Sequence, residues 1–311
     1  MNPSDASYRP EQASAVVAAF WAHHGITSPK GTSLAEPAIV PLEIASRIFT
    51  AAFDQTPTPQ ETSGIVLRAL ENLSDRLYEQ AAGMLVCLGT GSAAAAETIA
   101  RTVIEGAFNL LFIVSRDHEA RLFAFFHRYL QEHDRKLREW QQFESTKAQT
   151  PEQTAILHAI AVRASAHQTI SEFVKRLGEG LGFQQVNALS QYWPNTLYER
   201  CEQINKAGQY LTSYHRLSAS SHINAEETIR WLFGYYHAAI GQNAQLLQNL
   251  SLESVNYSAM ITRIAVDHYI EASTATCCAL SAELDHVSLR KTRSELHASI
   301  DTIAPATGAQ L

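Results

Sequence analysis

The sequence of 311 residues lacks the short motifs that identify many enzymes and metal proteins. It has no Walker A loop, no His-Glu-x-x-His helix and no Gly-x-Gly-x-x-Gly turn. Its few cysteines form no Cys-x-x-Cys pair, which disfavours a zinc site or a disulfide framework and predicts buried, reduced thiols. These cysteines are Cys87, Cys201, Cys277 and Cys278. We therefore expect no metal and no cofactor.

A long apolar run and a leader segment are also missing. The longest strongly apolar run, residues 106–114, is too short to cross a bilayer and includes Asn109. The N-terminal stretch MNPSDASYRPEQ has neither the basic start nor the apolar core of a secretory signal. These absences predict a cytoplasmic protein that does not enter a membrane.

Positive charge is scarce as well. Lysine and arginine total 24 against 31 acidic residues, which gives a formal net charge of −7. A protein that coats a nucleic-acid duplex is usually basic, so charge alone would not hold long nucleic acid on this chain. A single phosphate group can still be bound locally, which leaves RNA or a nucleotide as the candidate ligand.

Strand signals are hard to find, whereas helical ones fill the chain. Apolar residues recur three and four positions apart in almost every long segment, and strict alternation is nearly absent. Because the connections between these segments are short, neighbouring helices should run antiparallel. The sequence predicts an all-α, antiparallel multi-helix bundle of about eight or nine helices.

One segment suggests a division of the chain. DQTPTPQETS, at positions 54–63, contains two prolines and is typical of a linker. We expect an N-terminal helical appendage and linker over residues 1–60, and a main helical bundle domain over residues 61–300. Individual elements are predicted as helices over 10–25 and 41–53, an irregular stretch over 183–200 and a helix over about 200–218.

The segment 92–115 is apolar on nearly every side, which is typical of a helix in the centre of a bundle. It carries one polar stripe at every fourth position, formed by Glu97, Arg101, Glu105 and Asn109. If the stripe faces water, its ion pairs add only about 0.2–0.5 kcal/mol each. If it faces the interior, Arg101 and Glu105 form a desolvated pair that is costly unless structure or function requires it. The sequence leaves both interpretations open.

A second polar cluster is YHRLSASSHIN, at positions 214–224. Asn224 and Glu227 fit a capping box, so a helix is predicted to begin at Ala225. A helix start holds anions through its free N–H groups, and the nearby His222 could move a proton near neutral pH. The alternative is that the serines and the histidine only satisfy the backbone of the helix ends.

Arg216, near the start of this cluster, lies on the preceding helix end and could add a planar, permanently charged fork. On an unbroken helix Arg216 and His222 would point about 120° apart. The two side chains can therefore converge only if the chain bends between them, or if a second subunit supplies a matching pair.

Two spacings are those of metal ligands, Glu283 with His286 and His268 with Glu271. A di-iron bundle needs two Glu-x-x-His units and two further glutamates. Only the first pair has that order, so we predict no metal site from either.

The segments IARTVIEGAFNLLFIV and YHRLSASSHIN together resemble a widespread bacterial helical family known only as a domain of unknown function. The shared features are an arginine-x-x-x-glutamate helix and, further along the chain, a tyrosine, a serine and a histidine. The resemblance covers roughly residues 64–250, and it implies a helical fold without an established activity. It marks Arg101, Glu105, Tyr214, Ser218 and His222.

A second resemblance is to the HEPN superfamily of helical ribonucleases and toxins, whose signature is an arginine, four to six residues, and then a histidine. Arg216 and His222 fit with five residues between them, although Leu217 stands where that pattern often has a polar residue. The resemblance implies motifs paired across a dimer.

Three functions follow as hypotheses. The first is a metal-independent ribonuclease in which His222 exchanges protons, Arg216 stabilises the transition state, and Glu105 and Arg101 position these groups or the RNA. The second is a non-catalytic helical sensor or interaction module of a defence or toxin system, held by a buried polar network. The third is the binding of a small anionic ligand.

The sequence does not decide whether the protein is an enzyme. Its expected partners are RNA or a nucleotide, and a homodimer or a partner protein. The residues expected to bind rather than react are Tyr214, Ser218 and Asn109.

Overall fold

The computed structural model describes residues 10–27, 32–56, 62–183, 192–215, 217, 225–241, 245–280 and 284–303. Within these ranges the chain forms eleven α-helices, one π-helix and no strand, which confirms the all-α prediction with more helices than expected. They are α1 (Pro10–His23), α2 (Thr32–Gln55), α3 (Thr62–Gly89), α4 (Ala93–Val114), α5 (His118–Ser145), α6 (Pro151–Gly180), α7 (Leu197–Gln203), α8 (Ala207–Gln209), η3 (Tyr210–Tyr214, the π-helix), α10 (Ala225–Ala239), α11 (Leu246–Ala279) and α12 (His286–Asp301).

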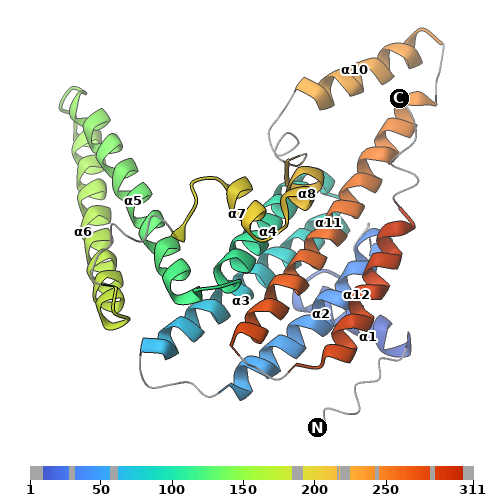
Figure 1. The fold of residues 1–311 in the computed structure, drawn as a ribbon. Coiled ribbons are helices and arrows are strands. Elements are labelled where there is room, and N and C mark those ends of the chain that lie inside the picture. The colour runs from blue at the N-terminus through green and yellow to red at the C-terminus, as the bar shows by residue number, and fades with distance from the viewer. Residues whose placement is uncertain are drawn as a thin grey trace.

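Helix α4 occupies the centre of the body, as its apolar pattern predicts. It packs against α3 on one side and along α11 on another, and α7 and η3 cover more of it (Figure 1). Ala100, Ile104 and Phe108 of α4 are fully buried, and they belong to the same core as Phe49 of α2 and Tyr269 of α11. The body thus has one apolar core, which is built around the two long helices α4 and α11.

Helix α2 begins earlier than the predicted segment 41–53. It starts at Thr32 and runs through Pro37 and Pro41. A proline inside a helix removes a backbone hydrogen bond, yet burial of residues such as Ile39 and Leu42 against the body outweighs that cost here. Helix α2 contacts α3, α11 and α12. The division of the chain into an appendage over residues 1–60 and a main domain over residues 61–300 stays a prediction.

Two helical hairpins project from this body (Figure 1). One is α5 with α6; the other is α10 with the N-terminal part of α11. Helix α6 begins as the sequence predicts, with Pro151 in its first turn and the Thr150 side chain accepting a hydrogen bond from the Gln153 amide. Among the described helices, none is long and apolar enough to span a membrane.

The segment between the two hairpins differs from the prediction. Residues 197–203, partly assigned to an irregular stretch, form α7, which starts with a capping box between Thr196 and Glu199. The predicted helix over about 200–218 is broken at Asn205, whose φ of 58° is left-handed, and it continues as α8 and η3. The capping box predicted at Asn224 lies outside the described residues.

The cysteines are only partly as predicted. Cys201 and Cys277 are buried thiols, whereas Cys87 is half-buried and Cys278 is exposed. Burial raises the pKa of Cys201 to about 11 and that of Cys277 to about 12, so both remain protonated at neutral pH. The prediction of buried thiols is therefore wrong for Cys278.

Candidate functional site

The polar stripe of α4 faces neighbouring helices rather than open solvent. Glu97 is only 9% exposed, and Arg101, Glu105 and Asn109 are half-buried. Each polar group would lose hydration without compensation unless a partner met it, and the structure supplies partners from distant parts of the chain. The interior interpretation of the stripe is therefore the one that the structure supports.

Tyr214 connects the middle of the stripe to η3. Its hydroxyl donates a hydrogen bond to Glu105 Oε2 at 2.7 Å and accepts one from Arg101 Nη2 at 3.3 Å. The Arg101 guanidinium carbon also lies 5.2 Å from the centre of the Tyr214 ring, within the range of a cation–π contact. Three of the residues singled out from the sequence thus form one network.

Burial sets the protonation of this network. Tyr214 is 8% exposed. Its burial, and to a smaller extent its hydrogen bond to Glu105, raise the pKa of the phenol above its ordinary value. The hydroxyl therefore stays protonated at neutral pH and remains a donor to the carboxylate. The residues 210–214 that place it form a π-helix, a rare element that often occurs at functional sites.

Asn109, at the far end of the stripe, binds an arginine that the sequence analysis missed. Arg200 Nε donates to Asn109 Oδ1 at 3.0 Å, and its Nη1 donates to the Pro194 carbonyl at 2.7 Å. The guanidinium also lies 4.6 Å from the Trp193 ring centre, and Arg200 is 7% exposed. Its burial lowers the pKa of Arg200, though not enough to discharge an arginine at neutral pH.

Further contacts fix both ends of α4. At the N-terminal end, Ser258 of α11 donates a hydrogen bond to Glu97. Beyond the C-terminal end, buried Arg121 donates to the Phe112 carbonyl, where a cation complements the helix dipole. Arg121 also reaches Gln203 of α7 at 3.5 Å. The stripe is thus held between α7, η3 and α11.

Aromatic rings extend from the network toward the surface. The ring centres of Tyr210 and Tyr214 are 5.2 Å apart, and those of Tyr198 and Tyr210 are 5.4 Å apart. The His215 ring lies 6.4 Å from that of Tyr210. Tyr198 and His215 are exposed, whereas Tyr214 is buried beside Arg101. We call Tyr198, Tyr210, Tyr214 and His215 the aromatic ladder.

Three predicted site residues, Arg216, Ser218 and His222, lie outside the described residues. The structure does place the residues on either side of Arg216. Leu217 is fully buried in the core, and Tyr214 belongs to the α4 network. The segment that carries His222 therefore departs from a point anchored beside Arg101 and Glu105.

The spacing of His268 and Glu271 produces an ion-pair cluster. Lys206 Nζ lies 2.6 Å from a Glu271 oxygen, and His268 Nδ1 lies 3.9 Å from the other. Burial alone would raise the pKa of Glu271, but the nearby His268 and the hydrogen bond from Lys206 outweigh it and lower this pKa to about 2. Among the described residues no group of three or more metal-ligating side chains comes together; Glu283 lies outside them.

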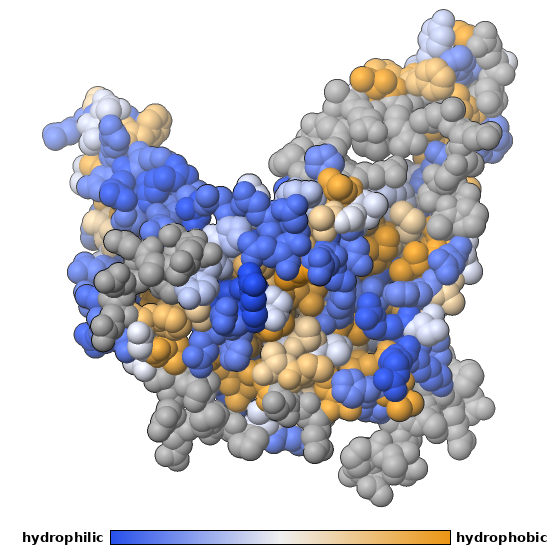
Figure 2. Space-filling model, viewed as in Figure 1, coloured by the Kyte–Doolittle hydropathy of each residue, from blue (hydrophilic) through white to orange (hydrophobic). Residues whose placement is uncertain are grey.

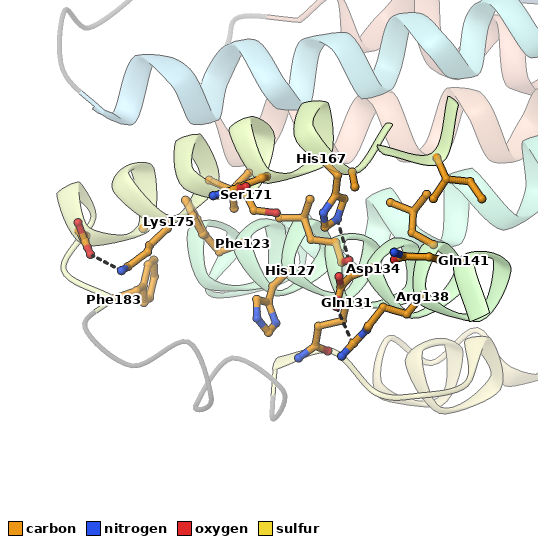
Figure 3. Close-up of a pocket in the computed structure, with 18 residues that line it drawn as sticks. Phe123, His127, Gln131, Asp134, Arg138, Gln141, His167, Ser171, Lys175 and Phe183 are labelled. Atoms are coloured by element: carbon orange, nitrogen blue, oxygen red, sulfur yellow. Dashed lines mark hydrogen bonds and ion pairs between the residues drawn. The ribbon is translucent and has the colours of Figure 1, made fainter. Parts of the chain in front are cut away.

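A cavity of about 650 Å³ lies elsewhere, between α5 and α6 (Figure 3). His127, Asp134 and Arg138 of α5 and His167 and Lys175 of α6 are among its lining residues. Asp134 and Arg138 pair with each other at 2.6 Å, and burial lowers the pKa of His127. None of the site residues predicted from the sequence lines this cavity. The amphipathic pattern of these helices indicates only a polar face exposed to solvent, so it gives no reason to predict a site there.

Comparison with known families gives one match. A model described as "Family of unknown function (DUF5677)" matches residues 69–233, which include α4, α7, η3 and the segment containing His222. No curated protein and no solved structure matches the chain significantly.

Proposed function

The chain belongs to a family of unknown function (DUF5677), and from its site we propose that it is a metal-independent ribonuclease. The observation that carries the proposal is the hydrogen-bonded network of Arg101, Tyr214 and Glu105. It brings a permanent cation and a carboxylate to the point where the Arg216–His222 segment begins. An imidazole or a carboxylate can exchange protons during phosphate transesterification, and a cation can stabilise the charge that develops on the phosphoryl oxygens.

The proposed reaction is attack by the ribose 2′-oxygen on the adjacent phosphorus. The 2′-hydroxyl loses its proton as the new O–P bond forms, and the 5′-oxygen gains one as its P–O bond breaks. His222 exchanges protons with one of these oxygens, and Arg216 stabilises the additional negative charge on the phosphoryl oxygens. The products are a 2′,3′-cyclic phosphate and a 5′-hydroxyl, so no electron donor or external group is consumed.

The described residues would serve as positioning groups. Glu105 fixes the Tyr214 hydroxyl, and Arg101 lies against the ring of the same tyrosine. This arrangement orients the η3 end from which Arg216 and His222 follow. The exposed members of the aromatic ladder, Tyr198 and His215, add rings on which unpaired bases can stack, a contribution that does not need a basic protein surface. We therefore propose single-stranded RNA as the substrate.

The test is cleavage of single-stranded RNA by purified protein in the presence of a chelator. We expect wild type to produce cyclic-phosphate ends and His222→Ala to be slower by roughly 10²–10⁴-fold, because general acid–base catalysis is lost. His286→Ala, which removes an exposed histidine at the start of α12 and outside the aromatic ladder, is the matched control and should retain most of the activity. Equal cleavage by wild type and His222→Ala would reject the proposal.

A second candidate is a non-catalytic interaction module, and one observation favours it. The Tyr214 hydroxyl is bonded on both sides within a buried network, as expected of a device that fixes the packing of η3 on α4. In this case Arg101→Ala lowers the melting temperature by several degrees, while wild type cleaves no RNA. An unchanged melting temperature in Arg101→Ala would count against this candidate.

A further inference from the structure

Helix α10 exposes an unusual amount of apolar surface. Seven large apolar side chains on or directly after this helix of 15 residues are each between 45% and 62% exposed. They are Ile229, Trp231, Leu232, Phe233, Tyr235, Tyr236 and Ile240. Figure 2 shows hydrophobic residues at the surface of this arm (Figure 2).

Gly234 shows which side of α10 is covered within the chain. A Cβ added at Gly234 would lie 2.9 Å from a methyl carbon of Leu250 and 3.3 Å from one of Leu247, so this side packs closely on α11. At about 100° per residue, Ile229, Leu232 and Tyr236 then lie on the opposite side. These three, with Phe233 and Ile240 flanking them, form an apolar stripe that points away from α11. We call these five residues the α10 stripe.

The exposed apolar area of the hairpin lies in the range where the largest monomer patches approach one side of a dimer interface. Half-exposed aromatic side chains leave on the order of 100 Å² each in water, so the four on α10 alone expose about 400 Å². Three aliphatic side chains of α10 and Leu252 of α11, which is 60% exposed, add to this area. The largest apolar patch of a typical monomer is about 300–600 Å², whereas one side of a stable dimer interface is about 800 Å².

We propose that the α10–α11 hairpin is the dimerisation surface of the protein, and that two copies pack their hairpins into a four-helix bundle. A hairpin with one apolar outer side is self-complementary, because a two-fold axis places the same stripe on both partners. The α10 stripe contains no charged side chain, so two chains of net charge −7 can meet there without like-charge contact. This proposal is independent of ribonuclease activity.

The test is sedimentation of the full chain across a range of concentrations. We expect wild type to sediment as a dimer, and the double variant Leu232→Glu/Tyr236→Glu to sediment as a monomer with an unchanged helical circular-dichroism spectrum. The matched control is Ile170→Glu/Phe173→Glu, which alters two equally exposed apolar residues on α6 and should leave the dimer intact.

Other outcomes would overturn the proposal. A monomeric wild type would leave the stripe to a different protein, a membrane or another segment of this chain. A dimer that persists in the α10 variant would place the interface elsewhere. Hydrogen exchange gives a second measurement that needs no variant, because the amides of residues 229–240 should exchange more slowly as the protein concentration rises.

Discussion

Helices α4 and α10 are both rich in large apolar side chains, but only α4 is surrounded. Other helices of the body cover α4, and its one polar stripe is matched by side chains from α7, η3 and α11. Helix α10 has one intramolecular neighbour, α11, among the helices with more than slight contact to it. An apolar helix is stable in water only when other elements cover its apolar side chains. Within the described chain this cover is present for α4 and is largely missing for α10.

The largest expected difference between the two helices is in the free energy of unfolding that is lost when an aromatic ring is removed. Phe108→Ala on α4 should destabilise the protein by about 3–5 kcal/mol, because Phe108 is fully buried and its ring packs 4.9 Å from His268. Phe233→Ala on α10 should cost less than about 1 kcal/mol when the chain is monomeric. Chemical denaturation of both variants at low protein concentration measures these changes in the free energy of unfolding. Equal changes in the two variants would show that α4 and α10 do not differ in how well they are covered.

The polar stripe of α4 sharpens the comparison further. Asn109→Leu should cost about 1–3 kcal/mol, because Arg200 Nε would lose its buried acceptor. Asn109→Asp, which retains an oxygen at that position, is the control and should be less destabilising. Urea denaturation of the three proteins provides the measurement; a stable Asn109→Leu variant would show that Arg200 does not depend on α4.

A smaller and pH-dependent effect should appear on the part of α11 that lies in the body. The pKa of Glu271 is lowered to about 2 from an ordinary value near 4.5, so its contribution is present above pH 4.5 and is lost as pH falls toward 2. Lys206→Met should therefore reduce stability at neutral pH by on the order of 1 kcal/mol, after allowance for solvent screening. The difference from wild type should shrink through this acidic window.

The control for this prediction is the exposed pair of Lys175 and Glu179 on α6, which are 3.9 Å apart. Lys175→Met should leave the stability nearly unchanged at every pH, because an exposed pair contributes little. If Lys206→Met were less stable than wild type by the same free energy of unfolding at neutral and at acidic pH, the lysine would act through packing rather than through Glu271.

Sequence patterns could predict the elements whose stability is local. The apolar periodicity of residues 92–115 predicted a central helix, and the every-fourth-residue spacing predicted the polar stripe. Its partners were not predictable, since Arg200 is 91 positions from Asn109 and Ser258 is 161 positions from Glu97. The start of α7 was missed although Thr196 and Glu199 have the spacing of a capping box.

The errors in α2 and η3 have a different cause. The prolines of α2 argue locally against a helix, and only burial against the body overrides them. The π-helix at residues 210–214 has no local signal that we recognise; it coincides with the contact of Tyr214 with α4. Tertiary contacts therefore decide both elements.

The most direct test of the proposed site is a double-mutant cycle on RNA cleavage with Glu105→Gln and His222→Ala. If the α4 network and the His222 segment act as one unit, the double variant should cleave no more slowly than His222→Ala alone. Losses that simply multiply, or a wild-type protein that cleaves no RNA in chelator, would contradict the account.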